Sequence, residues 1–285
     1  GGVRTTATYP FPTEEVPAGY YTFRVGVKGL TGGQSGDDIN KKRGNANKIL
    51  VRFLCNEMEK TDLRLIDIQS GGLHNAIPRE GYALCAVPAD QKEQMRIDLN
   101  ILSAAVEEEY SVTEKSLLFT LDSCEASAVA MERQAMRRML LSLQAVHNGV
   151  FAMSQDMEGL VETSSNLASI HLEGDRVVVT TSQRSSVGSA CQHMASVVRA
   201  AFELGGAEVL TNEGYPGWKL NPNSEIVKIA KESYVSLFGK EPLVLAIHAG
   251  LECGLFSEKY PNLDMVSFGP TLRGVHSPDE RLLIP

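Results

Sequence analysis

The sequence predicts an α/β protein in which one pattern of strands and helices occurs twice and is followed by a C-terminal part of different character. Several short runs alternate apolar and other residues at period two, as half-buried strands do. Longer runs between them place apolar residues three and four positions apart, the spacing of amphipathic helices. Residues 243–247 form a continuous apolar run, which is typical of a strand buried on both faces.

The first occurrence of the pattern runs from residue 21 to residue 121. It follows a Pro-rich stretch and contains a Gly-rich loop at 29–36. The split order strand, helix, strand, strand, helix, strand is that of a ferredoxin-like layer, a sheet with its helices on one face. The expected elements are strand 21–27, helix 45–59, strands 63–69 and 82–87, helix 90–110 and strand 116–121.

The second occurrence begins with a helix. A turn with the sequence Glu-Gly-Asp-Arg at 173–176 separates two alternating runs and indicates a β-hairpin. We therefore expect the two occurrences to extend one sheet. The expected elements are helix 128–147, strands 165–172 and 176–182, helix 187–204 and strand 208–210.

The composition changes at residues 211–218, where turn-forming residues surround the single tryptophan, Trp218. Beyond it we expect a helix at 224–238 with Ser224 as its N-cap, and strands at 243–247 and 264–268. Strands of the buried type usually belong to a larger parallel sheet. The C-terminal part is therefore expected to belong to a domain whose other strands lie outside this chain.

Composition and charge exclude several classes of partner. The chain has 285 residues and a formal net charge of −8, with acidic and basic residues interspersed. Surfaces for nucleic acid or an acidic membrane need clustered Lys and Arg, so neither partner is expected. The five cysteines are scattered and include no C-x-x-C pair, which fits a cytoplasmic location. The chain does not begin with Met, and we expect it to be a piece of a longer protein.

Two loops that follow buried-type strands are candidate ligand sites, because α/β sheets bind ligands at the carboxyl ends of their strands. In the loop at 269–280, His276 stands near two carboxylates and has the chemistry of a metal ligand. A lone histidine in such a sequence is more often a loop residue that caps a turn. In the loop at 247–254, glycines such as Gly250 permit close backbone approach to a ligand, and a strand-to-helix turn explains them equally well.

Two further features have polar chemistry without forming a complete site. Arg184 ends a strand among small polar residues and suits a carboxylate, although a solvated arginine at the rim is the more common outcome. The Gly-rich loop around Gln34 resembles an anion nest, but it lacks G-x-G-x-x-G and a Walker lysine. A metal site needs three or four protein ligands, and neither H-x-D nor H-E-x-x-H is present.

Longer motifs point to a family. Residues 247–256 read Ile-His-Ala-Gly-Leu-Glu-Cys-Gly-Leu-Phe, and residues 276–280 read His-Ser-Pro-Asp-Glu. These segments, together with the motifs at 44–48, 75–80, 161–164 and 215–218, resemble the aminoacyl-histidine dipeptidases. That group is also called the Xaa-His or cytosol non-specific dipeptidases, and it belongs to the di-zinc peptidase family that includes carnosinase. The resemblance covers essentially the whole chain.

The resemblance implies a two-domain enzyme with a zinc-peptidase α/β catalytic domain and an inserted α+β lid domain. Residues 1–12 would end the first catalytic segment, residues 13–212 would form the lid and dimerisation domain, and residues 213–285 would form part of the second catalytic segment. The implied protein is a cytoplasmic homodimer that assembles through the lid. It hydrolyses dipeptides, Xaa-His among them, with water activated by two zinc ions, for which manganese or cobalt are alternatives.

The same resemblance implies roles for individual residues. His276 matches the C-terminal metal ligand, Asn75 and Arg184 match lid residues that reach the dipeptide, and Gly250 lines the same pocket. The family's other ligands and its general base lie before the first residue of this chain, and a further helix follows Pro285. We therefore expect this chain alone to be inactive. The alternative hypothesis is that it acts as a catalytically incomplete dimerisation and substrate-binding fragment.

One position departs from the family pattern. The lid loop of the family usually reads Gly-Gly-His-Ser-Gly, where the histidine reaches a partner subunit's active site and polarises the scissile carbonyl. This chain has Gln34 at that position. A neutral amide donates a hydrogen bond but cannot become cationic, so stabilisation of the transition state is expected to be weaker by a few kcal/mol. Two interpretations follow, altered specificity or reduced activity.

Overall fold

The computed structural model describes residues 1–155, 157–218, 221, 223–244, 252–273 and 281–284. The described residues divide into two compact units. The first unit spans Gly1–Gly217, and the second contains the described residues that follow. The segment boundaries implied by the resemblance, 1–12, 13–212 and 213–285, stay predictions.

The first unit is built on one nine-stranded sheet with the strand order β13-β1-β12-β11-β5-β7-β3-β8 and with β10 paired to β11. Every pair of neighbouring strands is antiparallel. The strands are β1 (Gly2–Pro10), β3 (Tyr20–Lys28), β5 (Arg64–Gly71), β7 (Gly81–Pro88), β8 (Leu118–Ser123), β10 (Gly149–Met153), β11 (Val161–Glu173), β12 (Arg176–Ser185) and β13 (Glu208–Thr211).

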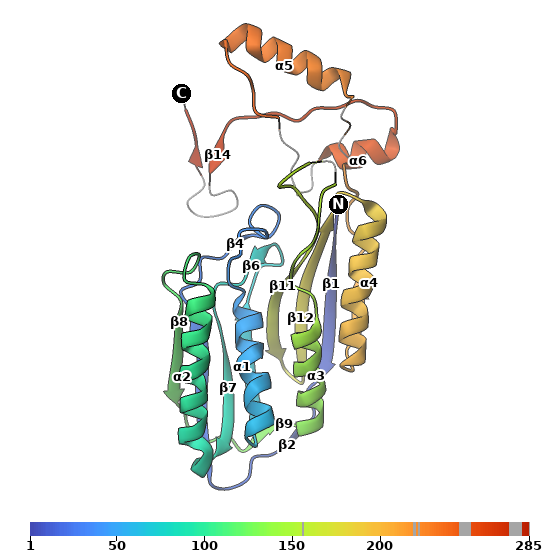
Figure 1. The fold of residues 1–285 in the computed structure, drawn as a ribbon. Coiled ribbons are helices and arrows are strands. Elements are labelled where there is room, and N and C mark those ends of the chain that lie inside the picture. The colour runs from blue at the N-terminus through green and yellow to red at the C-terminus, as the bar shows by residue number, and fades with distance from the viewer. Residues whose placement is uncertain (156, 219–220, 222, 245–251, 274–280, 285) are drawn as a thin grey trace. The chain divides into compact units, whose positions relative to one another are not determined.

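Four helices lie side by side on one face of this sheet in the order α2-α1-α3-α4 (Figure 1). They are α1 (Ala46–Lys60), α2 (Lys92–Glu109), α3 (Arg133–Ala145) and α4 (Gly188–Leu204). The core lies between the sheet and these helices, and its largest fully buried side chains include Phe23, Phe53 and Phe202. Two short strand pairs complete the unit: β2 (Thr13–Glu15) with β9 (Val129–Met131), and β4 (Gly33–Gln34) with β6 (Ala76–Ile77).

The α/β fold with its repeated split pattern is confirmed. In the first half, the strands that follow one another in the chain as β3, β5, β7 and β8 stand in the sheet as β5-β7-β3-β8, the ferredoxin-like order. The second half shows the same order as β11-β12-β1-β13. Its first strand is β1, so the whole first half is inserted between β1 and α3.

The strand β1 was missing from the sequence-based expectation. Its buried positions alternate regularly, with Val3, Thr5, Ala7 and Tyr9 turned toward the core. Two of these four side chains carry a hydroxyl, and Thr5 is satisfied by a hydrogen bond from its Oγ1 to Gln183 Oε1 of 2.8 Å. A buried position occupied by threonine weakens the apolar alternation that marks a strand.

Side chains of the segment at the start of α1 fasten the first half to the second. Asn45 is the N-cap of α1, where its side chain accepts from Lys48 N, while its Nδ2 donates to Leu167 O at 3.0 Å. Lys48 Nζ donates to the carbonyls of Leu143, Gln144 and Val146 at the end of α3. A lysine at a helix C-terminus satisfies carbonyls that have no partner within the helix.

The cysteines behave largely as small apolar side chains. All five are free, and Cys55, Cys85 and Cys191 are buried. Cys124 and Cys253 are half-buried. Burial raises the pKa of the Cys55 thiol to about 11, which keeps this side chain protonated at neutral pH.

The second unit contains α5 (Glu225–Phe238), α6 (Glu252–Lys259) and the strand pair β14 (Leu272–Arg273) and β15 (Arg281–Leu282). Ser224 is the N-cap of α5, as expected, and accepts from Val227 N at 3.2 Å. Residues 264–268, where a strand was expected, form no regular element, and Asp264 supports the N-terminus of α5 instead. Its Oδ2 accepts from Ile226 N at 3.0 Å. The strand expected at 243–247 lies partly outside the described residues.

Among the helices that the structure describes, none combines the length and the apolar character that a bilayer span requires.

One buried carboxyl lacks any partner. Glu57, in α1, is fully buried, and neither of its carboxylate oxygens has a hydrogen-bond partner. Burial raises the pKa of Glu57 from 4.5 to about 7, and the negative charge of Asp98 adds to this effect. A carboxyl with a raised folded-state pKa makes the protein less stable once it must ionise.

We predict that Glu57→Gln stabilises the protein above neutral pH and has little effect near pH 4. The folded protein retains a proton on Glu57 that the unfolded chain loses above about pH 4.5, so the wild-type protein loses stability until about pH 7. This shift corresponds to at most about 3 kcal/mol. Urea unfolding at about pH 4 and about pH 8 measures it. The half-exposed neighbour Glu59 provides the control variant Glu59→Gln, and an equal gain at both pH values would contradict the prediction.

Candidate functional site

Polar side chains collect at one end of β11 and β12, on the face of the sheet opposite the helices. Arg184 of β12 lies across from Ser164 of β11, and Ser182 lies across from both Asn166 and Arg4. Residues two apart in a strand point to the same face, so these side chains form one polar surface. The intervening residues of the sheet, such as Val179, point toward the helices and belong to the core.

Arg184 is the most buried cation of this surface, with 8% of its side chain exposed. Its Nη1 donates to Tyr215 Oη at 3.1 Å, and its Nε has no hydrogen-bond partner. Tyr215 is held beside β1 by two backbone hydrogen bonds with Gly2, of 3.0 and 2.9 Å. A Cβ at residue 2 would lie 2.7 Å from Tyr215 Oη, so a side chain there would displace the hydroxyl from its present place. The guanidinium is therefore held by Tyr215 while its Nε keeps no hydrogen-bond partner.

The segments of Gln34 and Asn75 reach the same end of the sheet. Gln34 pairs with Ala76 across β4 and β6, and Ser35 N donates to Asn75 O at 2.8 Å. Asn166 Nδ2 then donates to Ala76 O at 2.8 Å, which joins β6 to β11. The structure thus brings together three residues that the resemblance singled out, Gln34 and Asn75 from the first half and Arg184 from the second.

The charges of two arginines act on this surface. His74, which precedes Asn75, has its pKa lowered by burial and then by the positive charges of Arg4 and Arg184. A cluster of cations with a partly desolvated guanidinium favours an anionic ligand, and a carboxylate matches the geometry of a guanidinium. This surface is suited to bind one small carboxylate group.

Two residues of this surface were missed by the sequence analysis. Asn166 is 1% exposed and its Oδ1 has no hydrogen-bond partner. The signal was present, because four consecutive polar residues, Thr163–Asn166, stand in the strand directly before Leu167 and Ala168. His74 gave no comparable signal. It stands in a turn, and Arg184, whose charge acts on it, is remote in sequence.

The two remaining predicted site residues, Gly250 and His276, lie outside the described residues. Within the part of the chain that the structure describes, no three His, Cys, Asp or Glu side chains come close enough to hold a metal ion. The predicted metal ligand and the predicted pocket glycine therefore stay predictions.

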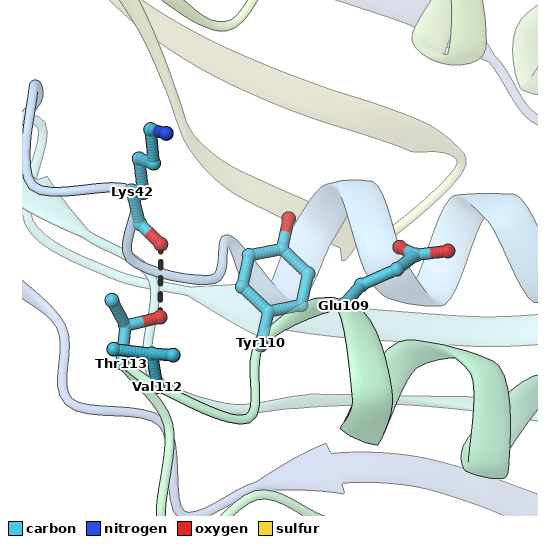
Figure 2. Close-up of a pocket in the computed structure, with 5 residues that line it drawn as sticks. All are labelled: Lys42, Glu109, Tyr110, Val112 and Thr113. Carbon is cyan, nitrogen blue, oxygen red and sulfur yellow. Dashed lines mark hydrogen bonds between the residues drawn. The ribbon is translucent and has the colours of Figure 1, made fainter.

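A surface hollow of about 520 Å³ lies elsewhere, at the C-terminal end of α2 (Figure 2). It is lined by Lys42, Glu109, Tyr110, Val112 and Thr113. None of the residues singled out by the resemblance lines it, and the polar surface around Arg184 fits a carboxylate better. Figure 2 shows one hydrogen bond across the hollow, from Thr113 Oγ1 to Lys42 O, of 3.0 Å.

Comparison with known proteins relates the chain to peptidases. The sequence profile of the peptidase dimerisation domain matches residues 25–114, which contain the end of β3 together with α1, β5, β7 and α2. The chain is 40% identical over 284 residues to the cytosol non-specific dipeptidase of Escherichia coli strain K12, covering all of this chain and 59% of that protein. It also matches the crystal structure of aminoacylhistidine dipeptidase from Vibrio alginolyticus with a TM-score of 0.91 and 39% identity.

The chain is a relative of the aminoacylhistidine dipeptidases. The structural match covers 99% of this chain and 58% of the Vibrio alginolyticus protein. The chain thus spans less than two thirds of the length of either relative. The resemblance to dipeptidases that the motifs predicted is confirmed, together with the α/β fold.

We predict that Arg184→Met raises the pKa of His74, because the substitution removes one of the positive charges that oppose protonation of the imidazole. An NMR titration of the histidine ring protons measures this pKa, with His74→Gln to assign the signal. Arg176→Met is the matched control, since Arg176 lies at the other end of β12 and is exposed. An unchanged pKa of His74 in Arg184→Met would contradict the electrostatic account.

Proposed function

We propose that the full-length protein to which this chain corresponds is a metal-dependent dipeptidase that cleaves Xaa-His and other dipeptides. The observation that carries the proposal is the 40% identity to a dipeptidase along the entire chain, combined with the convergence of Gln34, Asn75 and Arg184 at one end of the sheet. The activity is proposed for the full-length protein, because this chain covers 59% of that relative.

Arg184 is proposed to bind the terminal carboxylate of the dipeptide. Its Nε is buried without a hydrogen-bond partner, and we propose that it takes part in a bidentate contact with this carboxylate while Nη1 is held by Tyr215. The hydroxyl of Tyr215 holds one side of the guanidinium, so little orientational freedom is lost on binding. Asn75 and, by resemblance, Gly250 are proposed to contact the same dipeptide.

Gln34 is proposed to donate a hydrogen bond to the scissile carbonyl oxygen from its side-chain amide. A donor placed where negative charge develops stabilises the transition state more than the ground state. The neutral amide does so less strongly than the cationic histidine that the family has at this position. We therefore favour reduced activity over altered specificity as the consequence of Gln34.

We propose zinc as the cofactor, two ions per full-length subunit, with manganese or cobalt as alternatives. A divalent metal lowers the pKa of a bound water so that hydroxide forms at neutral pH. The described residues contain no cluster that would hold such an ion. His276 is therefore the only residue of this chain that we propose as a ligand, and the chain alone is proposed to be inactive.

The proposed partner is a second copy of the same chain, assembled through the lid. The matched dimerisation domain supports this, as it covers the first half of the large sheet. The alternative function, a catalytically incomplete dimerisation and substrate-binding module, applies to this chain in isolation. A cytoplasmic location is proposed because the Escherichia coli relative is named a cytosol dipeptidase.

We predict that the full-length protein, with zinc or manganese, hydrolyses Xaa-His dipeptides and that His276→Ala lowers kcat/KM at least about a hundredfold, since a lost ligand weakens the metal site. Release of free histidine measures the rate. Absence of hydrolysis in both proteins would contradict the proposed function. Calorimetric titration of this chain with zinc is the companion experiment, because tight binding of two ions would contradict the proposal that the chain alone is incomplete.

We predict that Gln34→His in the full-length protein raises kcat about tenfold or more while KM for the same dipeptide stays similar. An imidazolium stabilises the developing oxyanion better than an amide does. Steady-state kinetics on several dipeptides measures the change, and Gln144→His, at an exposed position of α3, is the control. An unchanged kcat with a new order of substrate preference would support altered specificity instead.

A further inference from the structure

The loop that carries Gln34 is tied at both ends to one buried carboxylate. Glu114 is 5% exposed and lies just beyond the end of α2. Its Oε2 accepts from Thr31 N at 2.6 Å, and its Oε1 accepts from Gly44 N at 2.7 Å. Hydrogen bonds from N–H groups to a carboxylate are among the strong ones in proteins. The two oxygens of one side chain therefore close the loop between residues 31 and 44.

Thr113, the residue before Glu114, also forms hydrogen bonds with both ends of the loop. Thr31 Oγ1 donates to Thr113 O at 3.1 Å, and Thr113 Oγ1 donates to Lys42 O at 3.0 Å (Figure 2). Both bonds join the same turn to the same two ends of the loop. The turn at 110–114 therefore holds both ends of the loop, and we call it the clasp. Glu114 is its buried acidic residue.

Within the loop, further hydrogen bonds lead from the clasp to Gln34. Asp38 Oδ2 accepts from Gln34 N at 2.9 Å and pairs with Arg43 Nη1 at 3.0 Å. Arg43 is adjacent to Gly44, whose N–H is bound by Glu114. Release of the Gly44 end would therefore loosen the ion pair that holds the backbone of Gln34.

We propose that Glu114 is a positioning residue for Gln34. The proposal rests on the proposed dipeptidase function, in which Gln34 donates to the scissile carbonyl. A hydrogen-bond donor acts on a transition state only when it is held within about half an ångström of the required place. Displacement by about 1 Å can cost about a hundredfold in rate. Glu114 fixes the backbone that carries the donor without contacting the substrate itself.

The first test uses amide hydrogen exchange on this chain. In Glu114→Ala, exchange in residues 31–44 is expected to become at least about tenfold faster, while β3 and β7 stay as protected as in the wild type. Glu114→Gln, which keeps one acceptor oxygen, should fall between the two. Glu57→Gln is the control for removal of a buried carboxylate that has no hydrogen-bond partner. Unchanged exchange in the loop, or a uniform increase along the chain, would overturn the proposal.

The second test uses the full-length protein and a double-mutant cycle. Glu114→Ala is expected to lower kcat about ten- to a hundredfold with KM changed less than about threefold. In a Gln34→Ala background the same substitution should have no further effect on kcat, because the amide that Glu114 positions is already absent. Additive effects would overturn the role of Glu114 and leave the dipeptidase function intact. A wild-type protein without dipeptidase activity would overturn the function, while loop exchange would still decide whether Glu114 fixes the loop.

Discussion

The antiparallel pairing of β5 with β11 joins the two halves of the first unit, and the site depends on it. Ser169, Ile170 and His171 of β11 pair with Gly71, Ser70 and Gln69 of β5. These three residue pairs join two four-stranded ferredoxin-like layers into one sheet. It also sets β6 beside β11, so that Gln34 and Asn75 from one half meet Arg184 from the other. Loss of this register would separate the polar groups even if both halves stayed folded.

The motif at 44–48, one of those that indicated the family, is explained by hydrogen bonds between the two halves. Asn47 Nδ2 donates to Leu167 O at 2.9 Å, and the side chains of Asn45 and Lys48 likewise donate to groups of the second half. Together these side chains supply donors to oxygens of the second half that lie away from water. The motif therefore fastens the start of α1 to its neighbouring half and needs no direct part in ligand binding.

Two buried carboxylates in this unit show how surroundings decide what the same chemical group does. Glu57 has no partner, and its pKa rises to about 7, so its ionisation works against folding. Glu114 accepts from two backbone N–H groups and thereby holds a loop in place. The difference lies mainly in what each carboxylate contacts, because both residues are buried.

The sequence by itself determined most elements of the first unit, since hydrophobic periodicity follows directly from which face of a helix or strand is buried. Threonine at one buried position, Thr5, helped to conceal β1, and Asp264, expected in a strand, caps α5 instead. Arg184, Asn75 and Gln34 were singled out by motifs, although only the fold brings them together. Asn166 and Glu114 acquire their roles from tertiary structure alone, because their partners lie 70 to 90 residues away in the chain. Periodicity reports burial, whereas a hydrogen bond between distant segments exists only once the sheet has closed.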